Sequence, residues 1–267
     1  MPDTRLNTTF EALNNLPVWQ RMATVTLAEM QGVKLMNRVD TKYVLSVDEV
    51  LDLLDRAAVE GYKVQLIGQC RACRYDTLYY DTAERDMYLV HHNRRLTRQK
   101  IRTRTYVESG VSFLEIKNKS NRGRTRKRRV GISAELFHGF SEDAAAMTFF
   151  SDHAWYDIGR LTPALRTRFT RITLINPAFT ERLTIDLDLR YRDMRGGREA
   201  TIEHMAIVEL KQDGLQDSVV KRVLRQMRIT PLKVSKYCIG TALTVEGVKR
   251  NRFKERLREI DKRLTKI

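Results

Sequence analysis

The sequence predicts an α+β fold: a closed, antiparallel, eight-stranded β-barrel surrounded by helices. Eight segments of the chain alternate polar and apolar residues with the two-residue period of a β-strand. The polar positions of these segments carry mostly Lys, Arg and a few carboxylates, in strand after strand. Segments with helical spacing precede, separate and follow the strands, and no repeat or Gly/Ser-rich linker divides the 267 residues.

The first strand is expected over residues 37–47. Its residues Asp40 and Lys42 fall on one face, whereas Val39 and Tyr43 fall on the other. The remaining seven strands follow from the same alternation and from their content of β-forming residues. They are expected at residues 73–82, 100–108, 112–120, 126–133, 168–176, 181–193 and 204–212.

Helices are expected around these strands. Ser46 followed by Glu49 is a capping-box signal, which predicts that a helix begins there and continues to Tyr62. Its spacing predicts a buried face of Val50, Leu51, Leu54 and Ala58. Further helical segments are expected at residues 83–95, 134–160 and 216–229. We divide the chain into a helical lead-in (1–30), a main domain (31–245) and a basic amphipathic helix (246–267). The apolar positions of this last helix are Phe253, Leu257, Ile260, Leu264 and Ile267.

The composition limits the class of protein. Lysine and arginine number 49 against 33 acidic residues, and a net charge of +16 predicts an anionic partner such as nucleic acid, anionic lipid or a phosphate-rich molecule. Three cysteines, with a lone CxxC pair at Cys70 and Cys73, form neither a disulfide framework nor a zinc motif. No apolar run approaches the roughly 20 residues that span a bilayer, and no signal-peptide pattern occurs. We therefore expect a soluble, cytoplasmic protein.

The charged residues keep to one face of each strand. In strand 112–120, Glu115 and Lys117 lie on one face, and Leu114 and Ile116 lie on the other. The charged faces of the neighbouring strands carry Lys100, Arg102 and Arg104, then Lys127 and Arg129, then Glu209 and Lys211. Two arrangements satisfy this pattern. Either each strand shows its charged face to water, or the sheet closes into a barrel with these faces inward and the apolar faces under helices.

The order carboxylate–x–lysine occurs twice, at Glu115–Lys117 and at Glu209–Lys211, and it favours the inward arrangement. An outer surface has no need of this order, whereas a phosphate-binding cavity does. Lys and Arg neutralise phosphoryl oxygens, and a carboxylate holds the divalent cation that bridges them. Glu209 and Glu115 are therefore the candidate ligands for Mg²⁺ or Mn²⁺.

Eight motifs occur in the order found in a known family: NRVDTKY, KIRTR, FLEIKNK, RTRKRRV, TRITLIN, ERLTIDLDL, VELK and KVSKYCIG. Over residues 33–243 the chain resembles the catalytic domain of the VTC (vacuolar transporter chaperone) polyphosphate polymerases, in a stand-alone prokaryotic form. That domain is a CYTH-like triphosphate tunnel metalloenzyme. The resemblance implies a closed barrel with a basic tunnel. It also implies transfer of the terminal phosphoryl group of ATP to a growing polyphosphate chain, with Mn²⁺ or Mg²⁺ as cofactor.

The resemblance also assigns roles to residues. It places Lys42 near the transferred phosphate, makes Arg102 and Arg104 the paired phosphate-binding arginines, and makes Lys117 a further catalytic cation. Glu209 matches the metal ligand of the family. The other phosphate-binding residues are expected to be Arg38, Lys127, Arg129, Arg171, Arg182, Lys211, Lys233, Ser235 and Lys236.

Several residues keep more than one interpretation. Asn37 stands where many relatives carry a glutamate, so one metal contact of the family is missing. Asp186 and Asp188 face inward by parity, where they would assist metal binding or pair with arginines. Four arginines beside the turn at Gly123 are expected to be solvated or to lie at the tunnel mouth: Arg122, Arg124, Arg126 and Arg128.

Other functions fit parts of the sequence. An inorganic or nucleoside triphosphatase would use water as the nucleophile, although more carboxylates would then be expected. A non-catalytic polyphosphate sensor would use the same tunnel. A nucleic-acid-binding protein would fit the charge, but no stacking platform, helix–turn–helix or zinc-finger spacing occurs, so nucleic acid is not the expected partner. The basic C-terminal helix leaves contact with a membrane surface or a membrane-protein partner as an alternative.

Overall fold

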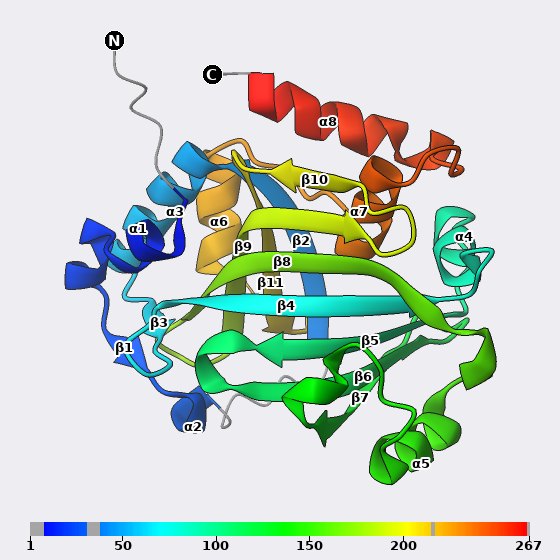
Figure 1. Ribbon diagram of the computed structural model, residues 1–267. Helices are drawn as coiled ribbons and strands as arrows, with labels where there is room; N and C mark the ends of the chain where they lie inside the picture. The colour runs from blue at the N-terminus through cyan, green and yellow to red at the C-terminus, as the bar shows by residue number, and fades with distance from the viewer. Residues whose placement is uncertain (1–7, 31–37, 215–216, 266–267) are drawn as a thin grey trace.

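The computed structural model describes residues 8–30, 38–214 and 217–265 (Figure 1). Its main feature is a continuous antiparallel path of eight strands. Each of these strands overlaps one of the eight segments that alternation predicts. In spatial order they are β2 (Arg38–Ser46), β11 (Met205–Asp213), β9 (Glu181–Asp193), β8 (Thr162–Ile175), β4 (Ala72–Asp81), β5 (Arg98–Tyr106), β6 (Val111–Lys119) and β7 (Thr125–Ile132).

The sheet is strongly curved, and β2 and β11 lie behind β4 and β8 in Figure 1. The strand path begins at β2 and ends at β7, and no ladder joins these two strands within the described ranges. The eight antiparallel strands are thus confirmed, whereas closure into a barrel stays a prediction. Three short strands were not predicted, because each is too short to alternate: β1 (Thr24–Val25), β3 (Lys63–Gln65) and β10 (Glu199–Ile202).

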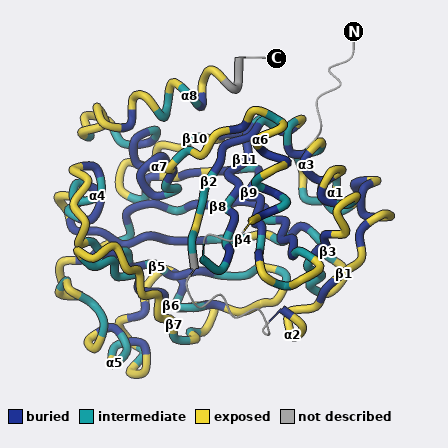
Figure 2. Tube along the Cα trace, turned by 180° about the vertical axis from the view of Figure 1, so that it is seen from behind, coloured by how far each residue is buried: buried dark blue, intermediate teal, exposed yellow. Residues whose placement is uncertain are grey.

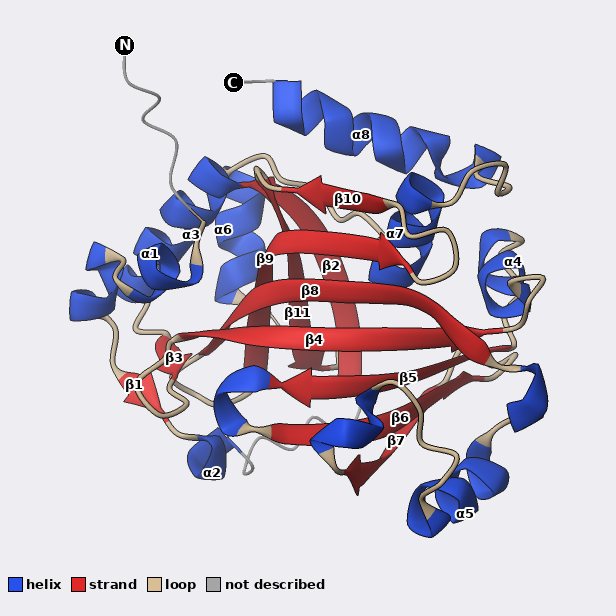
Figure 3. Ribbon diagram, in the orientation of Figure 1, coloured by secondary structure: helices blue, strands red, loops and turns tan. Residues whose placement is uncertain are grey.

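The outer face of β2, β9 and β11 is covered by helices (Figure 3). These are α1 (Phe10–Asn14), the 3₁₀ helix η1 (Pro17–Arg21), α3 (Val47–Val59) and α6 (Val219–Gln226). The predicted capping box begins α3, since the Glu49 N–H donates to Ser46 Oγ at 3.2 Å and the Ser46 N–H donates to Glu49 Oε2 at 2.8 Å. The buried face of α3 is Val47, Val50, Leu53, Leu54 and Ala57, so Leu51 and Ala58 lie at its margin.

A second helical layer covers the outside of β5, β6 and β7. It consists of η3 (Ala134–Phe137), α5 (Ala144–His153) and η4 (Ile158–Arg160), which together occupy the predicted helical region 134–160. They bury Ile101, Leu114 and Ile116 from the strands beneath. The apolar strand faces therefore point outward to helices, and Figure 2 shows the strands as mostly buried inside the molecule.

Three helices gather at one end of the sheet: α4 (Asp86–His92), α7 (Lys236–Thr244) and α8 (Lys254–Thr265). The short helix α2 (Leu27–Met30) lies at the other end. Helix α7 packs closely on β8 and β9, because a Cβ at Gly240 would lie 2.4 Å from Tyr191 and 2.7 Å from Leu165. The predicted amphipathic helix is present as α8, and Phe253 and Ile260 are buried. Leu264 and Ile267 lie outside the part of the chain whose side chains are described.

No helix in the described ranges combines the length and the hydropathy needed to cross a membrane.

Candidate functional site

The inward faces of the strands and the N-terminus of α7 line a cavity of about 1050 Å³. The charged strand faces that parity singled out therefore meet inside the molecule and not on its outer surface. Glu115 lies just behind the cavity wall, with 1% of its surface exposed. The side chain of Arg38 and all of Asn37 lie outside the described residues. All other residues assigned above to a role line the cavity: Lys42, Arg102, Arg104, Lys117, Lys127, Arg129, Arg171, Arg182, Glu209, Lys211, Lys233, Ser235 and Lys236.

Strand register places three lysines in one row across the cavity wall. Lys100 on β5 lies opposite Lys117 on β6, which lies opposite Lys127 on β7. Like charges directly opposite each other destabilise a sheet. Lys100 Nζ donates to Ser235 Oγ at 2.8 Å, which neutralises no charge. This row is therefore a ready site for an anion.

The next row contains the first of three buried carboxylates. Arg102 and Arg129 flank Glu115 in register, and Arg102 Nη2 lies 2.6 Å from Glu115 Oε2. Lys127 forms an ion pair with the other carboxylate oxygen. Burial alone would raise the pKa of Glu115, but Arg102, Arg104 and Lys127 hold this pKa well below its usual range.

The other two carboxylates repeat this arrangement. Glu209 lies opposite Lys42 in register and contacts Lys42 Nζ at 2.7 Å and Lys211 Nζ at 3.3 Å. Asp186 accepts two hydrogen bonds from Arg171, at 2.5 and 2.8 Å, and forms an ion pair with Lys236. Each carboxylate thus lies between two cations. Of the two interpretations given for Asp186, metal binding or pairing with arginines, the structure shows pairing with Arg171.

The structure corrects the expectation for Asp188. A register irregularity between β8 and β9 adjoins this residue, which adopts a left-handed backbone with φ of 49°. The irregularity shifts the alternation, so Asp188 pairs at 3.0 Å with the exposed Arg190 and does not line the cavity. The run Arg122–Arg129 is also divided. All of its residues are exposed, and Lys127 and Arg129 line the cavity, whereas its other arginines do not.

With this geometry established, comparison with known proteins assigns the chain to a family. A family model described as the VTC domain matches residues 37–245. The chain belongs to the VTC domain family. Membership confirms the resemblance found in the sequence and implies that the cavity handles triphosphate or polyphosphate. Comparison with curated protein sequences gave no match.

Solved structures similar to this chain were found at low sequence identity. A proposed adenylate cyclase from Bacillus halodurans has a TM-score of 0.48 and 12% identity, and the match covers 75% of this chain and 96% of that one. HpAC1 from Hippeastrum, described as having a dominant triphosphatase activity, has a TM-score of 0.46 and 13% identity, over 79% and 98% of the two chains. The PH1819 protein from Pyrococcus horikoshii has a TM-score of 0.42 and 13% identity, over 77% and 98%.

Triphosphate tunnel proteins use divalent metals, so we asked whether this VTC domain offers suitable ligands. Its described residues contain no group of three or more acidic, His or Cys side chains that would hold a metal ion by themselves. Glu115 and Asp186 are almost fully covered, whereas the Glu209 side chain is 14% exposed and lines the cavity. Mg²⁺ is often bound by one or two carboxylates together with substrate phosphates and water. The donor set therefore fits a metal that arrives with a phosphate ligand and takes Glu209 as its protein contact.

The cavity-lining residues that were missing from the predicted site include Lys100 and Tyr79. Lys100 was placed on a charged face but given no role, although it begins the lysine row. Tyr79 on β4 accepts a hydrogen bond from Arg102 at 3.1 Å. Burial would raise the pKa of Tyr79, but Arg102 and other cations lower it to about 8. The sequence could have indicated this position, because Tyr75, Thr77 and Tyr79 are two residues apart and therefore lie on the same face of their strand.

Four of the cavity-lining lysines have pKa values lowered to about 7 or 8. Burial, with neighbouring cations, lowers the pKa of Lys117 and of Lys127 to about 8. Burial also lowers the pKa of Lys236 to about 8 and that of Lys211 to about 7, although each contacts a carboxylate. An exposed lysine keeps its proton up to about pH 10.4.

These values predict opposite pH effects on binding and on stability. As the pH rises through about 8, the lysines lose their protons, so the affinity for a metal-free, non-hydrolysable ATP analogue should fall. Between the folded pKa and the unfolded pKa, only the unfolded chain holds these protons, so the free energy of unfolding of the ligand-free protein should rise over this window. Calorimetric titration and chemical denaturation on both sides of pH 8 measure the two effects. Lys117→Arg, which keeps its charge, should weaken the pH dependence of binding; an affinity that is constant across this window contradicts the assignment.

Proposed function

We propose that the cavity binds the phosphate chain of ATP and of polyphosphate, and that the protein transfers the terminal phosphoryl group of ATP to the end of a polyphosphate chain. The row Lys100–Lys117–Lys127 carries this proposal, because it gathers like charges where a phosphate chain would neutralise them. Phosphoryl transfer depends on positioning and charge stabilisation more than on a covalent catalyst. A cavity with many more cations than carboxylates supplies both.

The residues divide into two groups by what holds them. Arg102, Lys127 and Lys42 are fixed by carboxylates and are therefore preorganised to receive phosphoryl oxygens. Lys117 and Arg104 form no ion pair with a carboxylate among the described residues, so their charge is available to the ligand. A metal ion, when bound with the phosphates, supplies further charge neutralisation beside Glu209. Lys42, which lies opposite Glu209 on the neighbouring strand β2, donates a hydrogen bond to the transferred phosphoryl group.

We also propose that the sheet closes around the bound chain. Lys42 on β2 and Lys127 on β7, the two end strands, line the same cavity. Lys117 on β6 and Glu209 on β11 line this cavity too, so both ends of the strand path border the same space. A phosphate chain between them would draw the two cationic walls together.

We also propose that the protein is cytoplasmic and has a membrane-protein partner.

Transfer to a phosphate chain is favoured over hydrolysis, because Glu115, Asp186 and Glu209 are each engaged by two cations. The test is incubation of the purified protein with ATP and Mn²⁺ or Mg²⁺, followed by a gel for polyphosphate and an assay of free phosphate. We expect a ladder of polyphosphate with little free phosphate. Free phosphate without a ladder would instead identify a triphosphatase, and neither product would identify a polyphosphate sensor.

A further inference from the structure

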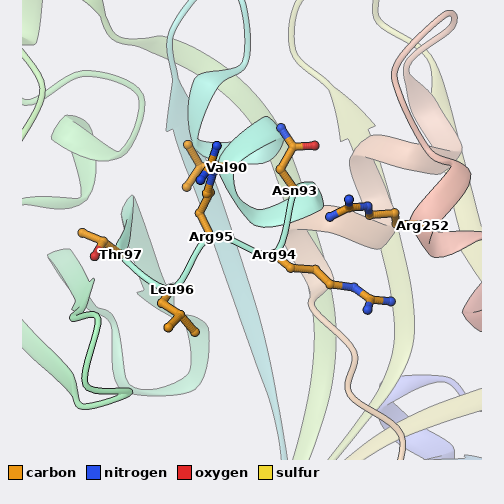
Figure 4. Close-up of a pocket in the computed structure, with 7 residues that line it drawn as sticks. All are labelled: Val90, Asn93, Arg94, Arg95, Leu96, Thr97 and Arg252. Carbon is orange, nitrogen blue, oxygen red and sulfur yellow. The ribbon is translucent and has the colours of Figure 1, made fainter.

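A second pocket, of about 780 Å³, opens where the loop after α4 meets the segment before α8 (Figure 4). Its lining includes three arginines and no acidic residue: Val90, Asn93, Arg94, Arg95, Leu96, Thr97 and Arg252. Arg94, Arg95 and Arg252 are exposed, and no ion pair with a carboxylate is recorded for them within the described ranges. The function proposed above does not use these arginines.

The backbone at Arg94 is unusual. Arg94 follows the C-terminus of α4 with φ of 59°, and its N–H donates to the His91 carbonyl at 3.1 Å. Glycine is the residue that this left-handed position after a helix normally favours, because a side chain there is strained. Arg228 after α6 has the same backbone conformation, so this conformation alone assigns no role to the Arg94 side chain. Arg94 extends from this position along the pocket wall in Figure 4.

The two walls of the pocket are held together by specific contacts. Tyr88 on α4 donates its hydroxyl proton to the Lys249 carbonyl at 2.9 Å. The Arg252 N–H donates to His92 Nε2 at 3.4 Å, and the Phe253 ring lies edge-on to His92 at 5.3 Å. These contacts hold the segments that carry the arginines in place relative to each other. The carbonyls at the end of α4, which would repel an anion, accept hydrogen bonds from the N–H groups of residues 93–95.

The pocket adjoins the main cavity, because Arg94 and Arg252 line both. The main cavity is lined by further cations, including Arg98 and Arg256. These charges act on His91, whose pKa is lowered first by burial and then by Lys100, Arg98 and Arg256. A line of positive charge thus leads from the cavity to the outer surface.

We propose that this pocket binds phosphates of a polyphosphate chain that extends out of the cavity. The inference rests on the proposed function, since it assigns the outer arginines to the same ligand. Three guanidinium groups suit a chain of phosphates, each of which arginine can grip with two hydrogen bonds. The pocket would make affinity depend on chain length, because tripolyphosphate is bound inside the cavity and only a longer chain reaches Arg94.

Arg94→Gly tests the proposal, because it removes the guanidinium and also relieves the backbone strain. Arg228→Gly is the matched control: Arg228 follows α6 with φ of 56°, is exposed and lies in neither pocket. Dissociation constants for tripolyphosphate and for long-chain polyphosphate are measured by calorimetry without metal. For Arg94→Gly we expect about a tenfold loss for the long chain, the size of one charge-assisted contact, and an unchanged value for tripolyphosphate. Arg228→Gly should change neither, and Arg252→Ala should repeat the loss.

Other outcomes overturn the proposal. An equal effect of Arg94→Gly and Arg228→Gly on the long chain would mean that the pocket adds only general charge. A loss of affinity for an ATP analogue that exceeds the loss for the long chain would assign the pocket to the nucleoside. Arg104→Ala, inside the cavity, separates this inference from the proposed function. If Arg104→Ala leaves tripolyphosphate binding unchanged while Arg94→Gly weakens the long chain, the outer pocket stands and the cavity assignment fails.

Discussion

Asp186→Asn should lower the free energy of unfolding by about 3–5 kcal/mol, the usual effect of removing one partner of a buried ion pair. Asp186 is 2% exposed and holds two cations, Arg171 and Lys236, whose side chains are 14% and 13% exposed. Without the carboxylate, both charges remain buried and repel each other. Chemical denaturation of the ligand-free protein measures the loss.

Asp188→Asn is the control for this experiment. It makes the same chemical change two residues away, where the partner Arg190 is 60% exposed. Asparagine also tolerates the left-handed backbone at this position. The expected loss is below about 1 kcal/mol. Equal losses for the two variants would mean that the buried charge network contributes little. Added tripolyphosphate should recover part of the stability of Asp186→Asn, because it neutralises the two charges that have lost their carboxylate partner.

Glu209→Gln should reduce metal-dependent turnover by roughly a hundredfold or more, since a metal ion supplies several kcal/mol of charge stabilisation in the transition state. The substitution removes the charge of the carboxylate but nearly keeps its shape. Metal-free phosphate binding should stay intact or improve, because Lys42 and Lys211 are then released for the ligand. Turnover over a Mn²⁺ titration, after the variant is shown to be folded, measures this effect.

Lys42→Ala should behave differently, because it removes the cation assigned to the transferred phosphate and leaves Glu209 in place. Metal dependence should persist while the transfer rate falls. The competing interpretation is that Glu209 is only a counter-ion of Lys42 and Lys211. Glu209→Gln would then lower stability, while activity per folded molecule would survive across the Mn²⁺ titration.

Much of the cavity could be predicted from strand alternation, because period two fixes which residues share a face. Lys117 and Lys42 were placed correctly for this reason, although their chemical roles stay predictions. The predicted inward position of Asp188 was wrong, because an irregularity in the β8–β9 register shifts the alternation there. Nothing local in the sequence marks that position, since register depends on the neighbouring strand.

The ion pairs were harder to predict than the faces. Pairing of Glu115 with Arg102 follows from register between β5 and β6, whereas pairing of Asp186 with Lys236 depends on where α7 packs. The segment that contains Lys236 does not alternate, so only the family resemblance linked it to the site. The arginine run 122–129 is explained in part: its strand alternates, and two of its cations point inward.

The most direct test of the account is a calorimetric titration of metal-free tripolyphosphate into the parent protein and into Arg104→Ala. Arg104 is 6% exposed and donates from Nε to Thr77 Oγ1 at 2.9 Å; no carboxylate forms an ion pair with it in the part of the chain that is described. We expect binding by the parent protein that weakens with salt. Arg104→Ala should lose about 1.5–3 kcal/mol of binding free energy, or roughly 10–150-fold in Kd. Equal affinity of the two proteins, or tighter binding of duplex DNA than of tripolyphosphate at physiological salt, would contradict it.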